Sequence, residues 1–181
     1  MKEKLSEREF RLMHFVMRCI DFVSDYVKKR SSSFGIKEGE TVIDYACGPG
    51  RYTVEFSKLV GPGGKVIAVD LIEIALKAVE DRIYKLGLTN VEIVLANGYD
   101  STLPSQIADK VFVLDAIHHI HDSNVFLNEL GRICKVNGCL IVDNGHITRS
   151  SLKQKIESSS AWKIVEENSD HLLCVRLSNL P

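Results

Sequence analysis

Residues Thr41–Thr53, with the sequence TVIDYACGPGRYT, decide the fold. A mostly apolar run stops after Asp44 at a turn of small residues, Ala46-Cys47-Gly48-Pro49-Gly50, and the chain can then continue as a helix. Gly48 and Gly50 can adopt backbone angles closed to other residues, so a ligand can approach the main chain there. The following helix would offer free N–H groups to that ligand. This stretch therefore predicts a strand, a ligand-binding turn and a helix in succession.

Length and charge limit the possible partners. The 181 residues fit a single domain, and a hydrophobic content of 45% is enough for one core. The formal net charge of −1 gives no general electrostatic reason to bind nucleic acid or an anionic membrane. We therefore expect a small-molecule partner, no nucleic acid and no membrane, and a homodimer is left open.

The start of the chain and the cysteines indicate a compartment. The opening residues, MKEKLSEREF, lack the apolar core of a signal peptide, and no apolar run approaches the ~20 residues that span a bilayer. The five cysteines form no CxxC pair, so neither a disulfide framework nor a thiolate zinc site is indicated. We expect a cytoplasmic protein with reduced thiols.

Short runs rich in Val and Ile alternate with helical stripes through most of the chain. The predicted strands are Thr41–Ala46, Lys65–Asp70, Val91–Ala96, Lys110–Ile117 and Cys139–Asn144. Helical stripes are Ile72–Leu86, closed by Gly87, and Phe126–Cys134, ended by Asn137-Gly138, with a further helix near Ser150–Glu157. This alternation predicts an α/β fold with a doubly wound, Rossmann-like, mostly parallel sheet.

The two ends of the chain depart from the alternation. Lys163–Glu167 and His171–Leu177 have hairpin spacing, which brings the sheet to seven strands with an antiparallel last strand. A capping box at Ser6–Glu9 and a helical stripe from Leu12 to Val27 predict an extra N-terminal helix, and Lys29–Gly39 is predicted to connect it to the first strand. We expect one domain, 1–181, with a helical cap at 1–35 and a core at 36–181.

The glycine turn could hold a dinucleotide or a ligand with a positive charge. A dinucleotide fingerprint, G-x-G-x-x-G started at Gly48, needs a small residue at Thr53, which fits poorly. Asp44 would lie badly beside a pyrophosphate and well beside an ammonium group. A nicotinamide-dependent dehydrogenase is therefore disfavoured, and a ligand with a positive charge near the turn is expected.

These residues resemble the class I S-adenosylmethionine-dependent methyltransferases. The first motif of that family is an acid two residues before G-x-G-x-G, and Asp44 to Gly50 follow it with Ala46 in place of the first glycine. The resemblance extends from Gly39 to Leu177 and includes the strand order. It implies S-adenosyl-L-methionine as the cofactor. The cofactor-binding residues that it implies are Asp44, Ala46, Gly48, Gly50, Asp70, Leu71, Asn97, Gly98 and Asp115.

The resemblance also gives most of these residues a role. Asp70 would bind both ribose hydroxyls, Leu71 would flank the adenine, and Asn97-Gly98 takes the place of an adenine-binding acid. Two departures from the family pattern matter. The methyl group of Ala46 is harmless if its φ is negative and costly if its φ is positive. Asn97 can hydrogen-bond the adenine edge but brings no charge.

The segment after the fourth strand, Asp115 to Asp122, holds the catalytic candidate. His118 is the proposed general base for a hydroxyl or thiol acceptor, because it lies one short turn past Asp115 and titrates near neutrality. His119 is the nearer rival, and packing or surface roles for the histidines stay open. Cys47 is expected to be a small filler of the turn and not a nucleophile.

Three functions are compatible with the residues on the acceptor side. The leading one is methyl transfer to a small molecule, with Phe10, Met13 and Met17 either in the core or covering the acceptor. A second is a non-catalytic module that binds the cofactor. A third, similar to catechol O-methyltransferase, would use Asp115, Asp143 and Asn144 to bind Mg²⁺. The first reading needs no metal.

Overall fold

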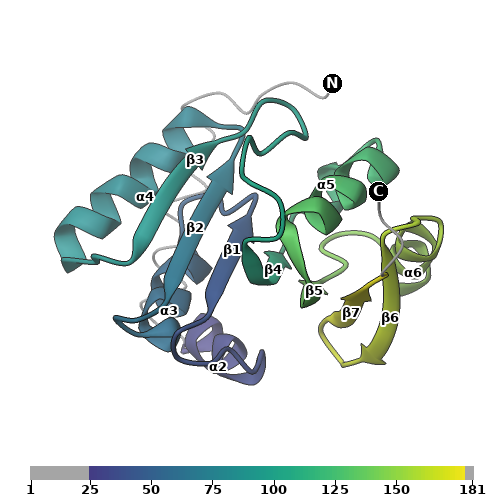
Figure 1. The fold of residues 1–181 in the computed structure, drawn as a ribbon, viewed down its shortest axis with the longest axis horizontal. Helices are drawn as coiled ribbons and strands as arrows, with labels where there is room; N and C mark the ends of the chain where they lie inside the picture. The colour runs from purple at the N-terminus through teal and green to yellow at the C-terminus, as the bar shows by residue number, and fades with distance from the viewer. Residues whose placement is uncertain (1–24, 178–181) are drawn as a thin grey trace.

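A seven-stranded sheet runs through the computed structural model, which describes residues 25–177 (Figure 1). Its order is β3-β2-β1-β4-β5-β7-β6. Strands β1 to β5 run parallel to one another, whereas β7 is antiparallel to both β5 and β6. The predicted doubly wound sheet with an antiparallel last strand is confirmed, and β7 lies between β5 and β6. The strands are β1 Thr41–Tyr45, β2 Lys65–Asp70, β3 Val91–Leu95, β4 Ala108–Val113, β5 Cys134–Val142, β6 Trp162–Glu167 and β7 Leu172–Arg176.

Helices cover both faces of the sheet because the strands alternate their side chains between two cores. In β1, Val42 packs with residues of α2 and α3, whereas Ile43 and Tyr45 pack with residues of α5 and α6. Helix α4 packs against the first of these faces through Leu76 and Val79. The helices are α2 Tyr26–Ser33, α3 Arg51–Val60, α4 Glu73–Leu86, α5 Ser123–Ile133 and α6 Arg149–Glu157, with a 3-10 turn at Ile117–His119.

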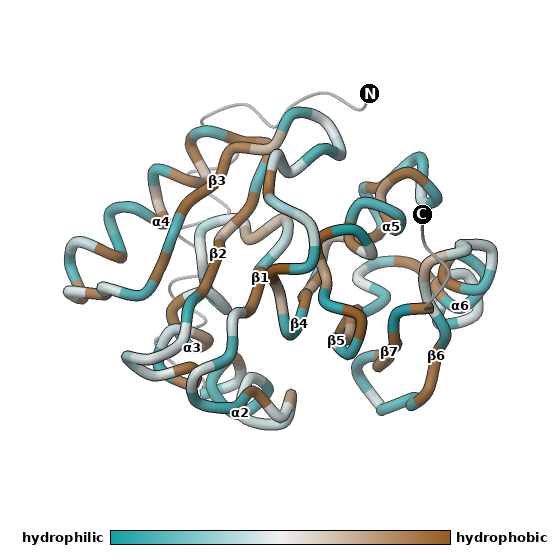
Figure 2. Tube along the Cα trace, in the orientation of Figure 1, coloured by the Kyte–Doolittle hydropathy of each residue, from teal (hydrophilic) through white to brown (hydrophobic). Residues whose placement is uncertain are grey.

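Hydropathy follows this arrangement. The strands are mostly brown in Figure 2, and α4 alternates between brown and teal as its apolar side meets the sheet. Helix α5 begins at a capped end, where the Asp122 carboxylate accepts a hydrogen bond from the Val125 N–H at 3.1 Å. Its buried residues recur at helical spacing, from Phe126 to Ile133.

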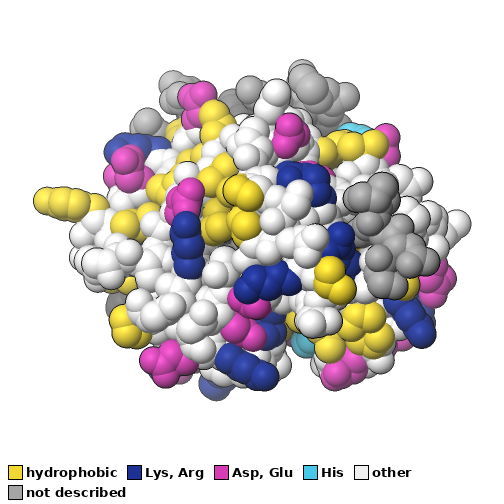
Figure 3. Space-filling view, in the orientation of Figure 1, with side chains coloured by type: hydrophobic (Ala, Val, Ile, Leu, Met, Phe, Trp, Pro, Cys, Tyr) yellow, Lys and Arg dark blue, Asp and Glu magenta, His cyan; other side chains and the backbone are white. Residues whose placement is uncertain are grey.

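The crossover from β3 to β4 contains no helix. Residues 96–107 form a loop with turns and one isolated bridge, and the side chains of Leu103 and Tyr99 pack against the core on the α5 side of the sheet. On the face of the molecule shown in Figure 3, hydrophobic side chains gather over the region that β2 and β3 occupy in Figure 1. Among residues 25–177, the short connection therefore leaves this half of the sheet with less cover than the half beside α5 and α6.

Several predicted boundaries differ from the structure; among them, β5 spans Cys134–Val142 where Cys139–Asn144 was predicted. The strand predicted at Lys110–Ile117 runs over Ala108–Val113, because Asp115 adopts a positive φ of 55° and the chain then enters the 3-10 turn. The helix predicted to end at Asn137-Gly138 ends at Ile133, because β5 begins at Cys134 and pairs with Ala108 before a register shift.

The predicted connection at Lys29–Gly39 begins later, because α2 extends to Ser33. The stripe from Leu12 and the residues Phe10, Met13 and Met17 lie outside the described residues. The division into a cap, 1–35, and a core, 36–181, stays a prediction.

Candidate cofactor site and neighbouring histidine cluster

The glycine turn joins β1 to α3 through positive φ angles. Ala46, Gly48 and Gly50 have φ values of 59°, 52° and 75°. The Cys47 N–H donates to the Val69 carbonyl at 3.1 Å, and the Gly50 N–H donates to the Cys47 carbonyl at 3.0 Å. A Cβ on Gly48 would meet nothing within 4 Å, whereas one on Gly50 would lie 3.0 Å from Val79 Cγ2. The turn is therefore packed against α4 at Gly50 and open at Gly48, where a ligand can approach.

Ala46, which replaces the first glycine of the family motif, has the positive φ that makes its methyl group costly. Its φ of 59° lies in the left-handed region, where a Cβ crowds the following carbonyl oxygen. The strain is about 1–2 kcal/mol for a residue other than glycine. Cys47 is buried, and burial raises the pKa of its thiol well above the ordinary value, which fits a filler and not a nucleophile.

Asp70 ends β2 as a buried carboxylate held by the backbone. Its Oδ2 accepts from the Gly48 N–H at 2.8 Å, and its Oδ1 accepts from the Ile72 N–H at 3.0 Å. Burial raises the pKa of Asp70, and the hydrogen bonds from Gly48 and Ile72 oppose that rise. A carboxylate has about four acceptor positions, so it can still accept from a ligand hydroxyl group. Next to it, Leu71 leaves 44% of its surface exposed, as an apolar ring support would.

Asp44 is the acid that precedes the turn. It is buried, and its Oδ2 accepts from Thr53 Oγ1 at 2.5 Å. Burial raises the pKa of Asp44 to about 7; the Thr53 hydroxyl opposes the rise, and the charge of Asp70 adds to it. Thr53, the residue that does not fit a dinucleotide fingerprint, thus anchors the acid at the end of β1.

The chain after β3 turns back on itself at the expected adenine position. Asn97 and Asp100 pair as an isolated bridge, with N–H to carbonyl distances of 2.9 and 3.1 Å, and Gly98 between them has a φ of 64°. The side chain of Asn97 is exposed. It is free to meet a ligand that lies along the carboxyl ends of β2 and β3.

Asp115 lies beyond the end of β4, beside β1 in the sheet. Its backbone is held at a φ of 55°, and its N–H donates to Asp143 Oδ1 at 2.8 Å. Its own side chain is exposed. The carboxyl ends of β1, β2 and β4 thus bring Asp44, Asp70 and Asp115 to one edge of the sheet, as the sequence predicted.

Three imidazoles cluster beyond β4 and β5. The rings of His118 and His119 have centroids 3.9 Å apart, and the ring of His146, from the loop after β5, lies 4.6 Å from that of His118. His118 packs against Gly145, where an added Cβ would clash with the His118 Nδ1. The structure therefore places the proposed base, His118, together with a histidine that sequence reasoning missed. The signal for His146 was its position four residues past the end of β5.

Of the oxygen ligands expected for a magnesium site, Asp143 has other partners. Both oxygens of Asp143 accept hydrogen bonds, one of them from the Arg30 guanidinium at 2.9 Å, and the Asn144 amide donates to the Ile147 carbonyl at 2.9 Å. Among residues 25–177, no three His, Cys, Asp or Glu side chains are arranged to hold a metal ion. Burial and the charge of Asp115 raise the pKa of Asp143, which the Arg30 guanidinium opposes.

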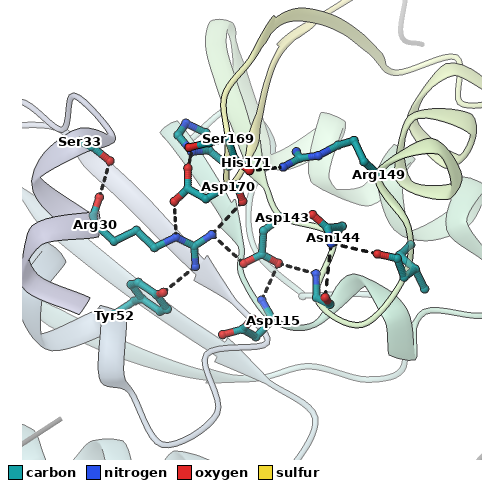
Figure 4. A network of polar contacts seen from close by, with 12 residues as sticks. Arg30, Ser33, Tyr52, Asp115, Asp143, Asn144, Arg149, Ser169, Asp170 and His171 are labelled. Carbon is teal, nitrogen blue, oxygen red and sulfur yellow. Dashed lines mark hydrogen bonds and ion pairs between the residues drawn. The ribbon is translucent and has the colours of Figure 1, made fainter. Parts of the chain in front are cut away.

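Arg30 is the largest omission of the sequence analysis. It is buried in α2 and binds Tyr52, Asp143 and Asp170 (Figure 4). Its one sequence signal is spacing: Tyr26, Arg30 and Phe34 lie four residues apart, which places an aromatic ring on either side of the guanidinium. The partners of Arg30 lie 22 to 140 residues away along the chain, where no motif points to them.

The strand order, the open glycine turn and the buried carboxylate at the end of β2 define a class I S-adenosylmethionine-dependent methyltransferase. The chain belongs to the family whose model is described as a methyltransferase domain, which matches residues 36–175.

Relatives and solved structures agree with this membership. The chain is 34% identical over 109 residues to the ubiquinone/menaquinone biosynthesis C-methyltransferase UbiE of Escherichia coli O1:K1, a match that covers 60% of this chain and 43% of that protein. The chain thus matches less than half the length of these curated relatives. A SAM-dependent methyltransferase from Aquifex aeolicus superimposes with a TM-score of 0.78 at 25% identity, over 83% of this chain and 89% of that one. A Methanococcus maripaludis structure assigned to the same class reaches 0.79 at 14% identity, over 99% and 96% of the two chains, and shows the fold alone.

The cofactor of this family, S-adenosyl-L-methionine, fits the residues present. Gly48 is open to a ligand, Asp70 has acceptor positions left for a ribose, and Leu71 offers an exposed apolar surface. Asp44 is a carboxylate that an ammonium group would complement. For residues 25–177, none of the helices combines the length and the apolar character that a membrane span requires.

Proposed function

We propose that this chain transfers the methyl group of S-adenosyl-L-methionine to a small-molecule acceptor at the carboxyl ends of β4 and β5. The observation that carries the proposal is the position of the histidine cluster. His118 and His119 follow β4, the neighbour of the strand that carries Asp44, and His146 follows β5, which lies on the far side of β4. Imidazoles beside a cofactor cradle suit proton transfer from an acceptor.

The chemistry needs few protein groups. The bound cofactor supplies a methyl group on a sulfonium, so its carbon–sulfur bond breaks as the acceptor–carbon bond forms and the electron pair stays on sulfur. The chain's own residues hold the cofactor through Asp44, Gly48 and Asp70, and exclude water from the reacting atoms. His118 would take the proton that the acceptor releases, with His119 as the alternative base.

The acceptor class follows from the relative and from the loops. A relative named as a C-methyltransferase supports carbon as the acceptor atom, and an electron-rich phenol-type ring carbon is the first acceptor to test. The short loops leave room for few other wall residues. A small acceptor, the absence of nucleic acid among the substrates, and a cytoplasmic location belong to this proposal, and a homodimer is left open.

Two other readings make different predictions. A non-catalytic module would bind S-adenosylhomocysteine without transferring a methyl group to any acceptor. A catechol-type O-methyltransferase would need Mg²⁺ at Asp115, Asp143 and Asn144, and the ion pair between Asp143 and Arg30 disfavours it.

The test is a transfer assay with methyl-labelled cofactor and the full chain. Phenols, quinols, an oligonucleotide and a protein extract are offered in parallel, with and without excess EDTA. We expect label in a phenol or quinol, on ring carbon by NMR, unchanged by EDTA. A His118→Gln variant should lose at least tenfold in turnover between pH 6 and 8. Label only in nucleic acid or protein, or binding without transfer, would overturn the proposal.

A further inference from the structure

The guanidinium of Arg30 is the centre of a buried network on the α2 side of the sheet (Figure 4). Its Nη1 donates to the Tyr52 hydroxyl at 2.7 Å and its Nε to Asp170 Oδ2 at 2.7 Å. Its Nη2 donates to Asp143 Oδ2 at 2.9 Å and to the Asp170 carbonyl at 3.1 Å. Four of the five N–H donors of a guanidinium are thereby used.

Aromatic rings surround the same group. The Arg30 Cζ lies 5.6 Å from the ring centroids of Phe34 and Tyr52, and 5.9 Å from that of Tyr26. Such distances allow cation–π attraction, which grows when the cation is out of water. Only 5% of the Arg30 side chain is exposed, and only 6% of the Asp143 side chain. The guanidinium is therefore fixed in position and orientation.

Asp143 connects the fixed guanidinium to two loops. One carboxylate oxygen binds Arg30, and the other accepts from the Asp115 N–H at 2.8 Å and from the Gly145 N–H at 3.1 Å. Asp115 begins the segment after β4, and Gly145 lies in the segment after β5. One carboxylate thus holds both segments at the edge where the proposed chemistry takes place.

Both held residues have left-handed backbones. Asp115 has a φ of 55° and Gly145 a φ of 47°. This conformation is less favoured for aspartate than for glycine, and the hydrogen bond to Asp143 helps to hold the Asp115 backbone in it. Gly145 also supports the His118 ring, which lies where a Cβ on residue 145 would be. The orientation of His118 therefore depends on the placement of Gly145.

We propose that Arg30 is a positioning residue for methyl transfer: through Asp143 it sets the backbones of Asp115 and Gly145, and through Gly145 the ring of His118. The expected effect on kcat rests on the proposed function. The expected effect on the backbones of Asp115 and Gly145 does not. Arg30 touches neither acceptor nor cofactor in this role. It connects helix α2 to the part of the site that faces the acceptor.

The chain provides a matched control near the amino ends of the strands, opposite the carboxyl ends where the site lies. Lys110, on β4, forms an ion pair with Glu40 at 2.6 Å, and their side chains are 12% and 17% exposed. This pair lies toward the amino ends of β1 and β4, away from Asp115 and Gly145. A Lys110→Met variant should therefore lose a partly buried ion pair without changing the loops.

The experiment measures amide hydrogen exchange by NMR in the full chain without cofactor, for Arg30→Lys, Arg30→Met and Lys110→Met. Lysine keeps the charge but cannot bind Tyr52, Asp143 and Asp170 together. We expect the Asp115 and Gly145 amides to exchange at least tenfold faster in both Arg30 variants. They should be unchanged in Lys110→Met. If Arg30→Met does not fold, Arg30→Lys alone decides.

Kinetics and chemical rescue complete the test. Once an acceptor is found, Arg30→Lys should lower kcat about tenfold while the affinity for S-adenosylhomocysteine changes less than threefold. Added guanidinium should partly restore Arg30→Met at concentrations that leave the wild type folded. Asp115 and Gly145 amides that exchange as slowly in Arg30→Lys as in the wild type would overturn the inference. Absence of any acceptor would count against the proposed function and leave the exchange result valid.

Discussion

At the carboxyl ends of the strands, the half of the site around β1 and β2 and the half around β4 and β5 are held together by different contacts. Around β1 and β2, backbone N–H groups and nearby side chains form the cradle: Gly48 and Ile72 bind Asp70, and Thr53 binds Asp44, over separations of 2 to 22 residues. Around β4 and β5, a buried ion pair joins residues 113 apart, and a second pair joins residues 140 apart. The first half tolerates changes elsewhere in the chain, whereas the second depends on distant elements reaching their places together.

The largest effect on stability should come from the half around β4 and β5, whose ion pairs join residues far apart in the chain. Asp143→Leu would leave the Arg30 cation buried, with the partly exposed Asp170 as its one remaining charged partner among residues 25–177. We expect a loss of about 3 kcal/mol in the free energy of unfolding. The double variant Arg30→Met with Asp143→Leu should lose clearly less than the sum of the two single losses. Urea unfolding at pH 7 measures all three. A loss below about 1 kcal/mol for Asp143→Leu would mean that this half is no more dependent on its charges than a surface pair.

Changes in the half around β1 and β2 should alter the affinity for the cofactor. Asp70→Ala removes the carboxylate that we propose binds the ribose hydroxyls, so it should weaken the binding of S-adenosylhomocysteine at least tenfold, or about 1.4 kcal/mol. Asp70→Asn keeps one acceptor oxygen and is the intermediate control. Calorimetry measures both. Unchanged affinity in Asp70→Ala would remove this carboxylate from the cofactor site.

A pH dependence should also arise in the half around β1 and β2. Because burial raises the pKa of Asp44 to about 7, the folded chain holds a proton there that the unfolded chain has released above about pH 4. The contribution of Asp44 to the free energy of unfolding therefore falls as the pH rises from about 4 to 7.

The same proton should affect cofactor binding, since an ammonium group favours ionised Asp44. We expect the affinity for S-adenosylhomocysteine to rise on the order of tenfold from pH 5.5 to 7. Calorimetry across this range measures it, with Asp44→Asn as the control that should show no such rise. An equal rise in the control would assign the titration to another group.

The smallest effect concerns the turn itself. Ala46→Gly removes a left-handed strain of about 1–2 kcal/mol, and the extra freedom of glycine in the unfolded chain offsets about 0.5–1 kcal/mol of this. A net gain under about 1 kcal/mol in unfolding experiments is expected. Gln106→Gly, at a φ of 58° outside the turn, is the matched control for strain relief. If Ala46→Gly destabilises the chain, the methyl group of Ala46 contributes packing that outweighs its strain.

The difference between the halves also explains what the sequence could reveal. The turn from Asp44 to Gly50 is contiguous, and Asp70 ends a run of Val, Ile and Ala, so both could be found from spacing and strand patterns. The end of β4 was placed too late, because the left-handed backbone of Asp115 is held by the carboxylate of Asp143 rather than by its own neighbours. Arg30 could not be recognised for a similar reason. Its role depends on Asp143 and Asp170, which the chain brings to it only in the folded sheet.

The ion pair between Arg30 and Asp170 has a consequence for the order of folding. Residues 25–100 contain the glycine turn, Asp70 and their partners, so the cofactor cradle can form while the rest of the chain is still being made. At a synthesis rate of about 5–20 residues per second, Asp170 follows Arg30 from the ribosome by several seconds. Until then the guanidinium lacks the two bonds that Asp170 accepts, so the partner that fixes Asp143 is itself incompletely held. Closure over such long loops is slow and raises contact order, so the acceptor half should be the last part of the molecule to become native.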